Sequence, residues 1–234
     1  MRIKLDTRRS LQRAMYADSI NAALVAGLVA AGARSEDVVG ISARPWTFGI
    51  EGRSDRRNAT VIHSVTVSTP DPELGEVLAR IKPDEVRCAS DNGDTLYFGA
   101  ARREMIDTAN AKNPELMVAF ASPFALPFRK QDRDIKLYAD ALDDVDLDAA
   151  LRAGLERRAG RNLDVSFHID PLSRKTDVTK RVVPLRKSPR GTIYLPAFSV
   201  PMTFRGKPED VAFAFLAGLG SKTRAGFGCP IFMK

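Results

Sequence analysis

Residues 217–229 read A-G-L-G-S-K-T-R-A-G-F-G-C and form the most informative stretch of the chain. Its four glycines fall within 11 residues, as two Gly-x-Gly pairs that five residues separate. Glycine permits positive φ angles and lets backbone amides approach an anion closely. The polar residues between the two pairs add side-chain donors. The pattern predicts a phosphate-binding loop made of Gly218, Gly220, Ser221, Lys222, Thr223, Arg224, Gly226 and Gly228.

Two well-known phosphate-binding loops do not fit this stretch. A P-loop needs a glycine directly before Lys-Ser/Thr and a helix after it, whereas here Ser221 precedes Lys222 and only 11 residues follow Thr223. A dinucleotide-binding loop needs a third glycine at the position of Thr223, and it follows a first strand instead of a helix. A glycine-rich turn before a last strand is the alternative interpretation.

The segments around the loop predict a mixed helix and strand half. Pro208 marks the start of a helix over Glu209–Leu216, and Phe227–Met233 has the pattern of a last strand. The same half contains a strand, a basic helix and two further strands, predicted over Leu116–Ala121, Leu147–Ala159, Leu163–Ile169 and Thr192–Phe204.

The first half of the chain shows the order strand, helix, strand, strand, helix, strand. Apolar residues at steps near 3.6 predict helices over 11–32 and Pro70–Ile81. β-Branched and aromatic runs predict the strands, which are Arg2–Asp6, Val38–Ile50, Ala59–Thr69 and the pair Glu85–Ala89 with Thr95–Ala101. This order is that of a ferredoxin-like domain. We therefore predict an α+β fold of two tandem ferredoxin-like (βαββαβ, RRM-like) domains, over residues 1–108 and 109–234.

Positive charge is concentrated in the second half. The chain has a formal net charge of +7, and residues 152–190 alone hold eleven basic against four acidic residues, a local balance of +7. Such focusing favours a polyanion partner, above all nucleic acid. The predicted contacts from the basic helix are Arg152, Arg157, Arg158 and Arg161. A solvated helix face is the alternative, because an acidic start and a basic finish also suit the helix macrodipole.

Composition excludes several other classes of protein. The 234 residues are 44% hydrophobic and 28% charged, which is ordinary globular composition. The longest weakly polar stretch, residues 22–33, is shorter than the roughly 18 residues that cross a bilayer, and no secretory signal is recognisable. We expect a cytoplasmic protein with no membrane partner. Cys88 and Cys229 stand in no metal-ligand cluster, so we expect no metal and no cofactor.

The helix and glycine-rich loop at the C-terminus resemble those of the repeat-associated (RAMP) proteins of CRISPR systems, in particular the endoribonuclease that cuts precursor CRISPR RNA within its repeats. Arg44-Pro45-Trp46-Thr47-Phe48 is similar to the family's second strand, and Phe120-Ala121-Ser122-Pro123-Phe124 to the segment that opens its second half. The resemblance implies two tandem ferredoxin-like domains. It also implies metal-independent cleavage by the ribose 2′-OH, which leaves a 2′,3′-cyclic phosphate and a 5′-OH.

Many members of the resembled family use a histidine between the first helix and the second strand, and this chain has none there. Its two histidines are His63, which we expect to be packed in a strand, and His168, on a strand face that could touch RNA. The corresponding region supplies Arg34, Arg44 and Tyr16 as candidate catalytic residues. Arginine stays protonated, but it can clamp a phosphate and stabilise a pentacoordinate charge. Solvated loop charges for the two arginines, and a core position for the tyrosine, are the alternatives.

Three hypotheses follow. The first is a nuclease that binds a CRISPR repeat RNA hairpin, stays on the mature RNA and meets other subunits of an effector complex; its shortage of histidine is similar to type IV systems. The second is a non-catalytic RAMP subunit that binds the RNA as a scaffold, which the missing histidine favours. The third is a generic ferredoxin-like RNA-binding protein, which would show no preference for a repeat hairpin.

Overall fold

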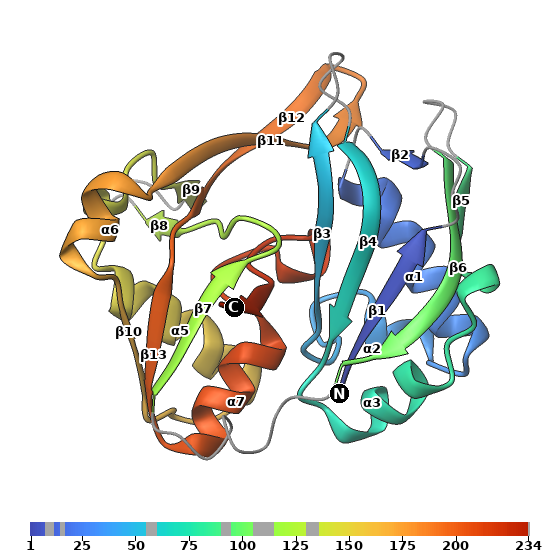
Figure 1. Cartoon of the computed structure of the whole chain (residues 1–234), viewed down its shortest axis with the longest axis horizontal. Helices are drawn as coiled ribbons and strands as arrows, with labels where there is room; N and C mark the ends of the chain where they lie inside the picture. Colours follow the sequence, from blue (N-terminus) through green and yellow to red (C-terminus); the bar gives the residue numbers. More distant parts are fainter. Residues whose placement is uncertain are drawn as a thin grey trace.

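The computed structural model describes residues 1–7, 12–14, 17–54, 60–89, 95–104, 115–129 and 136–233. Within them the chain forms two main antiparallel sheets that lie side by side, each with helices packed against it, and two separate two-stranded hairpins (Figure 1). None of the helices in these ranges has the length and apolar character that a bilayer crossing requires.

The first half builds its sheet in the order β3-β4-β1-β6-β5, with the short strand β2 between β4 and β6. Every pairing in it is antiparallel. Its elements are β1 (Arg2–Thr7), β2 (Gln12–Ala14), α1 (Ala17–Ala30), α2 (Ser35–Val38), β3 (Thr47–Ser54), β4 (Thr60–Ser68), α3 (Pro72–Ala79), a 3₁₀ turn (Pro83–Glu85), β5 (Arg87–Ala89) and β6 (Thr95–Arg103).

The second half builds its sheet in the order β10-β13-β7-β14, again antiparallel throughout. Two hairpins, β8–β9 and β11–β12, stand outside that sheet. The elements are β7 (Glu115–Phe120), β8 (Pro127–Arg129), β9 (Lys136–Tyr138), a 3₁₀ turn (Leu142–Asp144), α5 (Leu147–Ala159), β10 (Val165–His168), α6 (Pro171–Thr176), β11 (Thr179–Ser188), β12 (Gly191–Ser199), β13 (Met202–Gly206), α7 (Pro208–Ala217), a 3₁₀ turn (Thr223–Ala225) and β14 (Pro230–Phe232).

The two sheets share one topology. The four main strands are β1, β3, β4 and β6 in the first half and β7, β10, β13 and β14 in the second. When each set is numbered 1 to 4 along the chain, both sheets have the spatial order 2-3-1-4. In each half one helix follows the first of these strands and another follows the third. This is the arrangement of a ferredoxin-like βαββαβ unit. The predicted α+β fold of two tandem ferredoxin-like domains is therefore confirmed. The predicted boundary between residues 108 and 109 lies outside the described residues and stays a prediction.

Each half has its own hydrophobic core between sheet and helices. In the first, Leu24 of α1 and Leu78 of α3 pack with strand residues such as Phe98. In the second, Leu151 of α5 and Phe215 of α7 pack with their own sheet. Separate cores are what two domains require, because each sheet must bury one face.

Three predicted elements differ from the structure. Helix α1 begins at Ala17 instead of near residue 11, because Gln12–Ala14 pairs with the sheet as β2. The strand predicted over 38–50 begins only at Thr47, since the preceding segment is α2 and a loop. The strand predicted over 192–204 is two strands, broken at Pro201, where one pairs with β11 and the next with β10 and β7.

The two halves are joined by buried polar contacts. Arg2, 2% exposed, donates from Nη1 to the Pro230 carbonyl at 2.8 Å, and its guanidinium lies 4.9 Å from the ring centroid of Phe215. The Ser68 hydroxyl donates to the Leu216 carbonyl at 3.0 Å. Both contacts join residues more than 140 positions apart, so they fix the position of the second half against the first.

Candidate functional site

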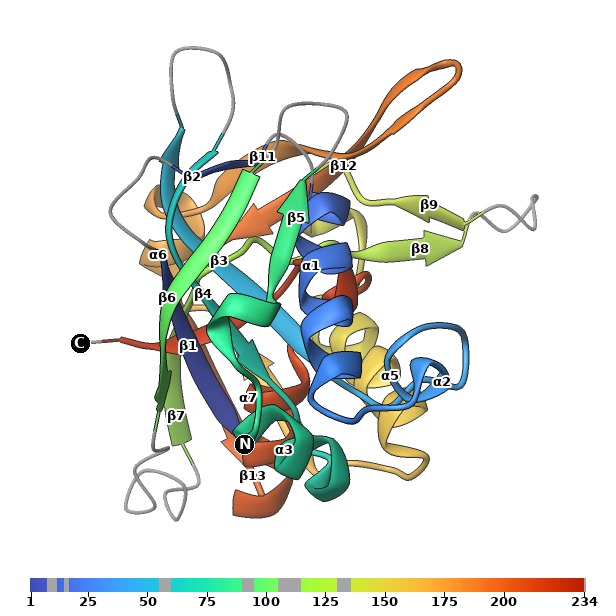
Figure 2. The ribbon, with the colours of Figure 1, turned by 90° about the vertical axis from the view of Figure 1, so that its right-hand side faces the viewer.

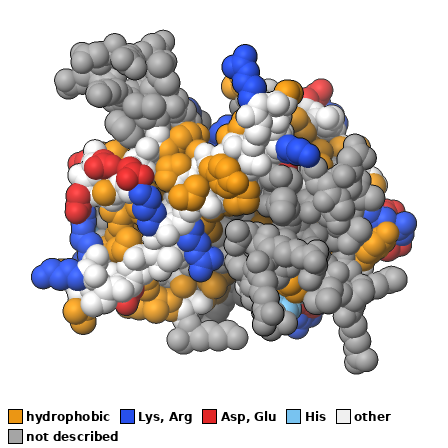
Figure 3. All heavy atoms as spheres, turned by 90° about the horizontal axis from the view of Figure 1, so that it is seen from above, with side chains coloured by type: hydrophobic (Ala, Val, Ile, Leu, Met, Phe, Trp, Pro, Cys, Tyr) orange, Lys and Arg blue, Asp and Glu red, His pale blue; other side chains and the backbone are white. Residues whose placement is uncertain are grey.

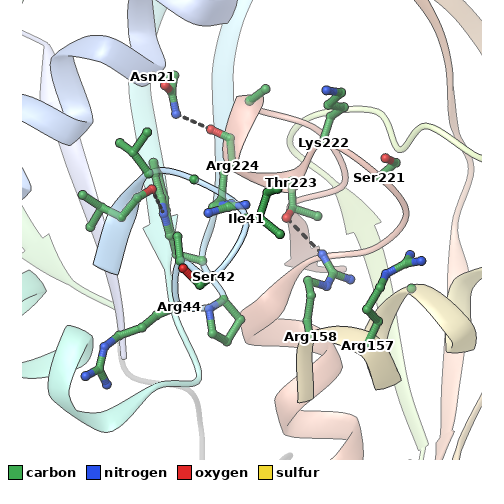
Figure 4. A pocket seen from close by; sticks show the side chains of 18 of the residues that line it. Asn21, Ile41, Ser42, Arg44, Arg157, Arg158, Ser221, Lys222, Thr223 and Arg224 are labelled. Carbon is green, nitrogen blue, oxygen red and sulfur yellow. Dashed lines mark hydrogen bonds between the residues drawn. The ribbon is translucent and has the colours of Figure 1, made fainter. Parts of the chain in front are cut away.

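A cleft of about 760 Å³ lies where the two halves meet (Figure 4). Its walls come from four elements: α1, the loop between α2 and β3, α5 and the glycine-rich loop. The described lining residues are Asn21, 38–46, Gly154, Arg157, Arg158 and 220–225. Figure 2 shows the glycine-rich loop, drawn in red, beside α1, and Asn21 of α1 donates a hydrogen bond to this loop.

The glycine-rich loop is a tight turn held by backbone hydrogen bonds. Leu219 N donates to Gly228 O at 2.8 Å, and Gly228 N donates to the Pro123 carbonyl at 2.9 Å. Gly228 has a φ of 65°, and a Cβ there would lie 1.9 Å from the Leu219 oxygen. Position 228 therefore requires a glycine, because the two ends of the loop approach each other too closely for a side chain. All four predicted loop glycines have positive φ.

Three side chains hold the loop from outside. Asn21 of α1 donates from Nδ2 to the Arg224 carbonyl, and Thr47 of β3 lies 3.4 Å from the Thr223 carbonyl oxygen. Arg158 of α5 donates from Nη1 to the Thr223 hydroxyl at 3.0 Å (Figure 4). The sequence predicted the loop, but Asn21 and Thr47 carry no signal that would have assigned them to it.

Several cations of the cleft have no acidic partner among the described residues. Arg157 and Lys222 are exposed, and neither forms an ion pair within the described part of the chain. Arg224 is partly buried, and its Nη1 atom has neither exposed surface nor a described hydrogen-bond partner. Burial lowers the pKa of the Arg224 guanidinium. The described lining includes no Asp or Glu, so the cleft is a cationic site suited to an anion.

Lys222 also has the only positive φ among the described non-glycine residues, at 61°. A left-handed conformation is unfavourable for a side chain with a Cβ, and it persists only where the surrounding structure imposes it. The turn from Lys222 to Ala225, closed by a backbone hydrogen bond of 2.8 Å, imposes it here.

The other two arginines predicted as RNA contacts, Arg152 of α5 and Arg161 just after its end, are engaged elsewhere. Arg152 pairs with Asp148 at 2.6 Å, and Arg161 pairs at 2.6 Å with Asp210, which is 2% exposed. Although burial tends to raise the pKa of Asp210, the hydrogen bonds from Arg161 and the Asp164 amide lower it overall. Neither arginine is among the described residues that line the cleft.

The two candidate catalytic arginines lie near each other but differ in position. Arg44 lines the cleft, yet its guanidinium donates to Asp37, Asp71 and Glu73. These bonds raise its pKa and, with those of Arg34, lower the pKa of Asp37 to about 2. Arg34 is exposed, pairs with Asp37 at 2.8 Å and does not belong to the described lining. Tyr16, the third candidate, lies outside the described residues.

Neither histidine belongs to the described lining of the cleft. His168 is exposed on β10, where its Nε2 lies 3.1 Å from the Ser166 hydroxyl. His63 is exposed, so the prediction of a packed side chain was wrong. The pairing of β4 with β3 shifts between Glu51 and Gly52, opposite this residue, and such a bulge turns a side chain out of its expected face.

The loop between α2 and β3 adds exposed apolar side chains to the cleft. Val39 is half-exposed and Ile41 is fully exposed, and both stand on the loop between α2 and β3. Below them Trp46 is buried and donates from Nε1 to the Val38 carbonyl at 3.1 Å, which anchors the loop. One wall of the cleft therefore suits an anion and the other suits a flat apolar group.

A second cationic surface is the hairpin β11–β12, which crosses the top of the molecule in Figure 1. Its basic side chains that form no ion pair with described residues are Arg181, Arg186, Lys187 and Arg190. Exposed Val182 and Tyr194 lie between them. Figure 3 shows this face from above, with hydrophobic side chains beside lysine and arginine side chains.

Within the described ranges no group of His, Cys, Asp or Glu could hold a metal ion.

Fold and cleft together define a tandem ferredoxin-like protein with a cationic site between its halves. Residues 106–230 match the family model described as CRISPR associated protein Cas6, C-terminal. The chain belongs to this Cas6 family.

Solved structures show the same fold over the whole chain. A Cas6-related protein from Pyrococcus furiosus has a TM-score of 0.73 at 15% identity, with 100% of this chain and 98% of that chain covered. A CRISPR associated protein Cas6 gives 0.70 at 16%, with 100% and 99% covered. A RAMP protein that binds different RNA substrates gives 0.68 at 15%, with both chains fully covered. No curated protein sequence matches the chain.

Proposed function

We propose that this chain is a cytoplasmic, metal-independent endoribonuclease that binds CRISPR repeat stem-loops and cuts precursor CRISPR RNA. The ribose 2′-OH attacks the adjacent phosphate, and the products carry a 2′,3′-cyclic phosphate and a 5′-OH. The enzyme then stays on the mature RNA, where it meets other subunits of the effector complex. Membership of the Cas6 family supports repeat binding and processing. We further propose that it is the type IV variant of this enzyme, because the chain has only two histidines.

The observation that carries this proposal is the unpartnered charge of the cleft. Arg157, Lys222 and Arg224 face a site whose described lining has no carboxylate, so an anion from outside the chain is the missing partner. A backbone phosphate supplies that anion, and a base beside it fits the apolar wall at Val39 and Ile41.

The chemistry available here is alignment and charge stabilisation. Cleavage needs a 2′-OH held in line with the scissile bond, and cations for the negative charge that builds on the phosphorane. Lys222 and Arg224 supply such cations; Arg44 is a third cation of the cleft, but three carboxylates already pair with it, so we expect its contribution to be smaller. Tyr16 remains a proposed candidate, whereas Arg34, the other arginine to be tested, is exposed and paired with Asp37, so we expect it to contribute little.

Stem recognition fits the hairpin β11–β12. A-form RNA presents mainly phosphates and 2′-hydroxyls, so a duplex is bound by shape and by cations. The exposed basic residues of the hairpin stand on the same half of the molecule as Arg157, which would let a stem rest on them while its base enters the cleft.

The second candidate function is that of a non-catalytic RAMP subunit that binds CRISPR RNA as a scaffold. It is favoured by one observation: the described lining of the cleft contains no histidine. The two functions share the RNA and differ in chemistry, so one assay separates them.

The test uses 5′-labelled RNA of the cognate repeat, incubated with the protein in EDTA. The nuclease predicts a single cut that is lost when the nucleotide before the scissile phosphate is 2′-deoxy. Tight binding without a cut would assign the scaffold function, and equal binding to a scrambled stem would assign a generic RNA-binding protein.

Matched variants locate the site. Lys222→Met and Arg44→Ala should lower cleavage far more than binding, since each removes a cation from the cleft. Lys82→Met is the control, because Lys82 is an exposed lysine that pairs with Glu85 outside the cleft. Unchanged rates in Lys222→Met and Arg44→Ala would remove the cleft from the reaction.

A further inference from the structure

Arg158 occupies an unusual position between two helices and the glycine-rich loop. It leaves the last turn of α5, and its Nη2 donates to the Gly218 carbonyl at 2.9 Å. Its Nη1 donates to the Thr223 hydroxyl at 3.0 Å and lies 3.4 Å from the Ala217 carbonyl oxygen. One guanidinium therefore ties the end of α7 to the middle of the loop.

The partners of this guanidinium are all neutral. No described carboxylate pairs with Arg158, and its Nε atom has neither exposed surface nor a described partner. Burial, with the nearby charges of Arg157 and Arg224, lowers the pKa of the Arg158 guanidinium to about 10. Arginine is the side chain that stays charged in such a place, and the C-terminal carbonyls of α7 favour a cation there.

The donors of Arg158 are directed to the protein, whereas its neighbours Arg157 and Lys222 are exposed. Arg157, one position earlier on the same helix, is exposed and has no described ion partner. Lys222 and Arg224 lie on either side of Thr223, the residue that Arg158 holds (Figure 4). A shift of Thr223 would move both cations together.

We propose that Arg158 is a positioning residue: it does not contact RNA itself, but fixes the glycine-rich loop so that Lys222 and Arg224 meet the scissile phosphate. The effect on cleavage rests on the proposed function above. The effect on the loop does not, because the contacts exist without RNA. The inference replaces the direct phosphate contact that the basic pattern of α5 predicts for this residue.

The first test measures the loop without RNA. Hydrogen exchange of residues 218–226 is followed in the wild type and in Arg158→Met, Arg158→Lys and Arg157→Met. We expect exchange at these amides to rise about tenfold in Arg158→Met. We expect a smaller rise in Arg158→Lys, which keeps the charge but loses the fork, and no change in Arg157→Met. Equal exchange in Arg158→Met and the wild type would overturn the proposal.

The second test measures binding and cleavage of the cognate repeat RNA at several salt concentrations. A lost phosphate contact lowers the slope of log Kd against log salt by about 0.7–0.9. We expect this fall for Arg157→Met with unchanged hydrogen exchange, and we expect a fall in Arg158→Met only together with faster exchange of the loop, because Lys222 and Arg224 move with it. In contrast, kcat at saturating RNA should fall about 100-fold in Arg158→Met, as expected for misplaced cations, with partial recovery in Arg158→Lys.

The outcomes separate the two ideas. A reduced salt slope for Arg158→Met with wild-type hydrogen exchange at residues 218–226 would show a direct RNA contact and refute the positioning role. A wild type that binds but never cuts would refute the nuclease, while hydrogen exchange and salt slopes would still decide the role of Arg158. Urea unfolding of each variant checks that the two halves stay folded, so that a change confined to residues 218–226 is read as a loop effect.

Discussion

Gly228→Ala should destabilise the protein well beyond what its backbone conformation alone would cause. Gly228 has a φ of 65°, and an added Cβ would lie 1.9 Å from the Leu219 oxygen. The left-handed conformation costs an alanine about 1–2 kcal/mol. The clash adds a second cost, because the two ends of the loop must separate and weaken the bond from Leu219 N to Gly228 O. Losing a buried backbone hydrogen bond costs about 1–3 kcal/mol, so the total is about 2–5 kcal/mol.

Gly160→Ala provides the matched control. Gly160 ends α5 with a φ of 67°, and a Cβ there would meet no atom within 4 Å. Gly160→Ala has only the cost of the left-handed conformation. The free energies of unfolding of the two variants should therefore differ by about 1–3 kcal/mol, which is the cost of the close approach at Gly228. Equilibrium unfolding in urea, followed by circular dichroism, measures both free energies.

Function gives the same pair a second readout. Gly228→Ala should weaken binding of the cognate repeat RNA, because the cations of the loop move with its backbone, whereas Gly160→Ala should bind as the wild type does. If Gly228→Ala costs no more stability than Gly160→Ala, the contact between the two ends of the loop does not determine its shape, and the reasoning fails.

Three further predictions concern polar partners. Arg161→Met should destabilise the fold at pH 7, since it leaves Asp210 buried without its cation. The pKa of Asp210 is lowered from 3.8, so its ionised form stabilises the folded protein above pH 3.8. The loss in free energy of unfolding caused by Arg161→Met should therefore shrink as the pH falls below 3.8. An equal loss at pH 7 and pH 3, measured by urea unfolding, would contradict this. Arg34→Ala should leave cleavage within about twofold of the wild type, as expected for an exposed surface pair; a large loss in the repeat-RNA assay would restore it as a catalytic candidate. Thr223→Val removes one acceptor of Arg158 and should reproduce a fraction of the hydrogen-exchange change of Arg158→Met; full protection of the loop would argue against that bond.

Local patterns predicted the elements whose ends are set by neighbours in sequence. Helix α5 occupies the predicted residues, because Asp146 accepts from the Ala149 amide at its start and Gly160 ends it in a left-handed conformation. Strand β7 and helix α7 likewise lie close to their predicted ranges. Element order then sufficed for the fold, since two βαββαβ runs have one common antiparallel solution.

Elements decided by distant partners were not predictable in this way. The segment Gln12–Ala14 continued a helical pattern and became a strand because β4 and β6 offered partners. The hairpin β11–β12 was only half recognised, since the prediction joined β12 to the next strand of the sheet. Sequence periodicity contains no information on which of two possible neighbours a strand will meet.

The same limit explains why local charge was a poor guide to the site. Residues 152–161, at and just after the end of the basic helix, include four arginines, which the sequence pattern alone does not distinguish. In the fold Arg152 and Arg161 are neutralised by carboxylates, and Arg158 is turned onto carbonyls and a hydroxyl. Only Arg157 is left for a ligand among the described contacts. What matters for binding an anion is therefore the charge that remains after the protein's own acids and carbonyls are paired, and that remainder depends on contacts between the two halves. By this criterion Lys222 and Arg224, which lie outside the basic run of residues 152–190, contribute more to an anion site than Arg152 and Arg161 do.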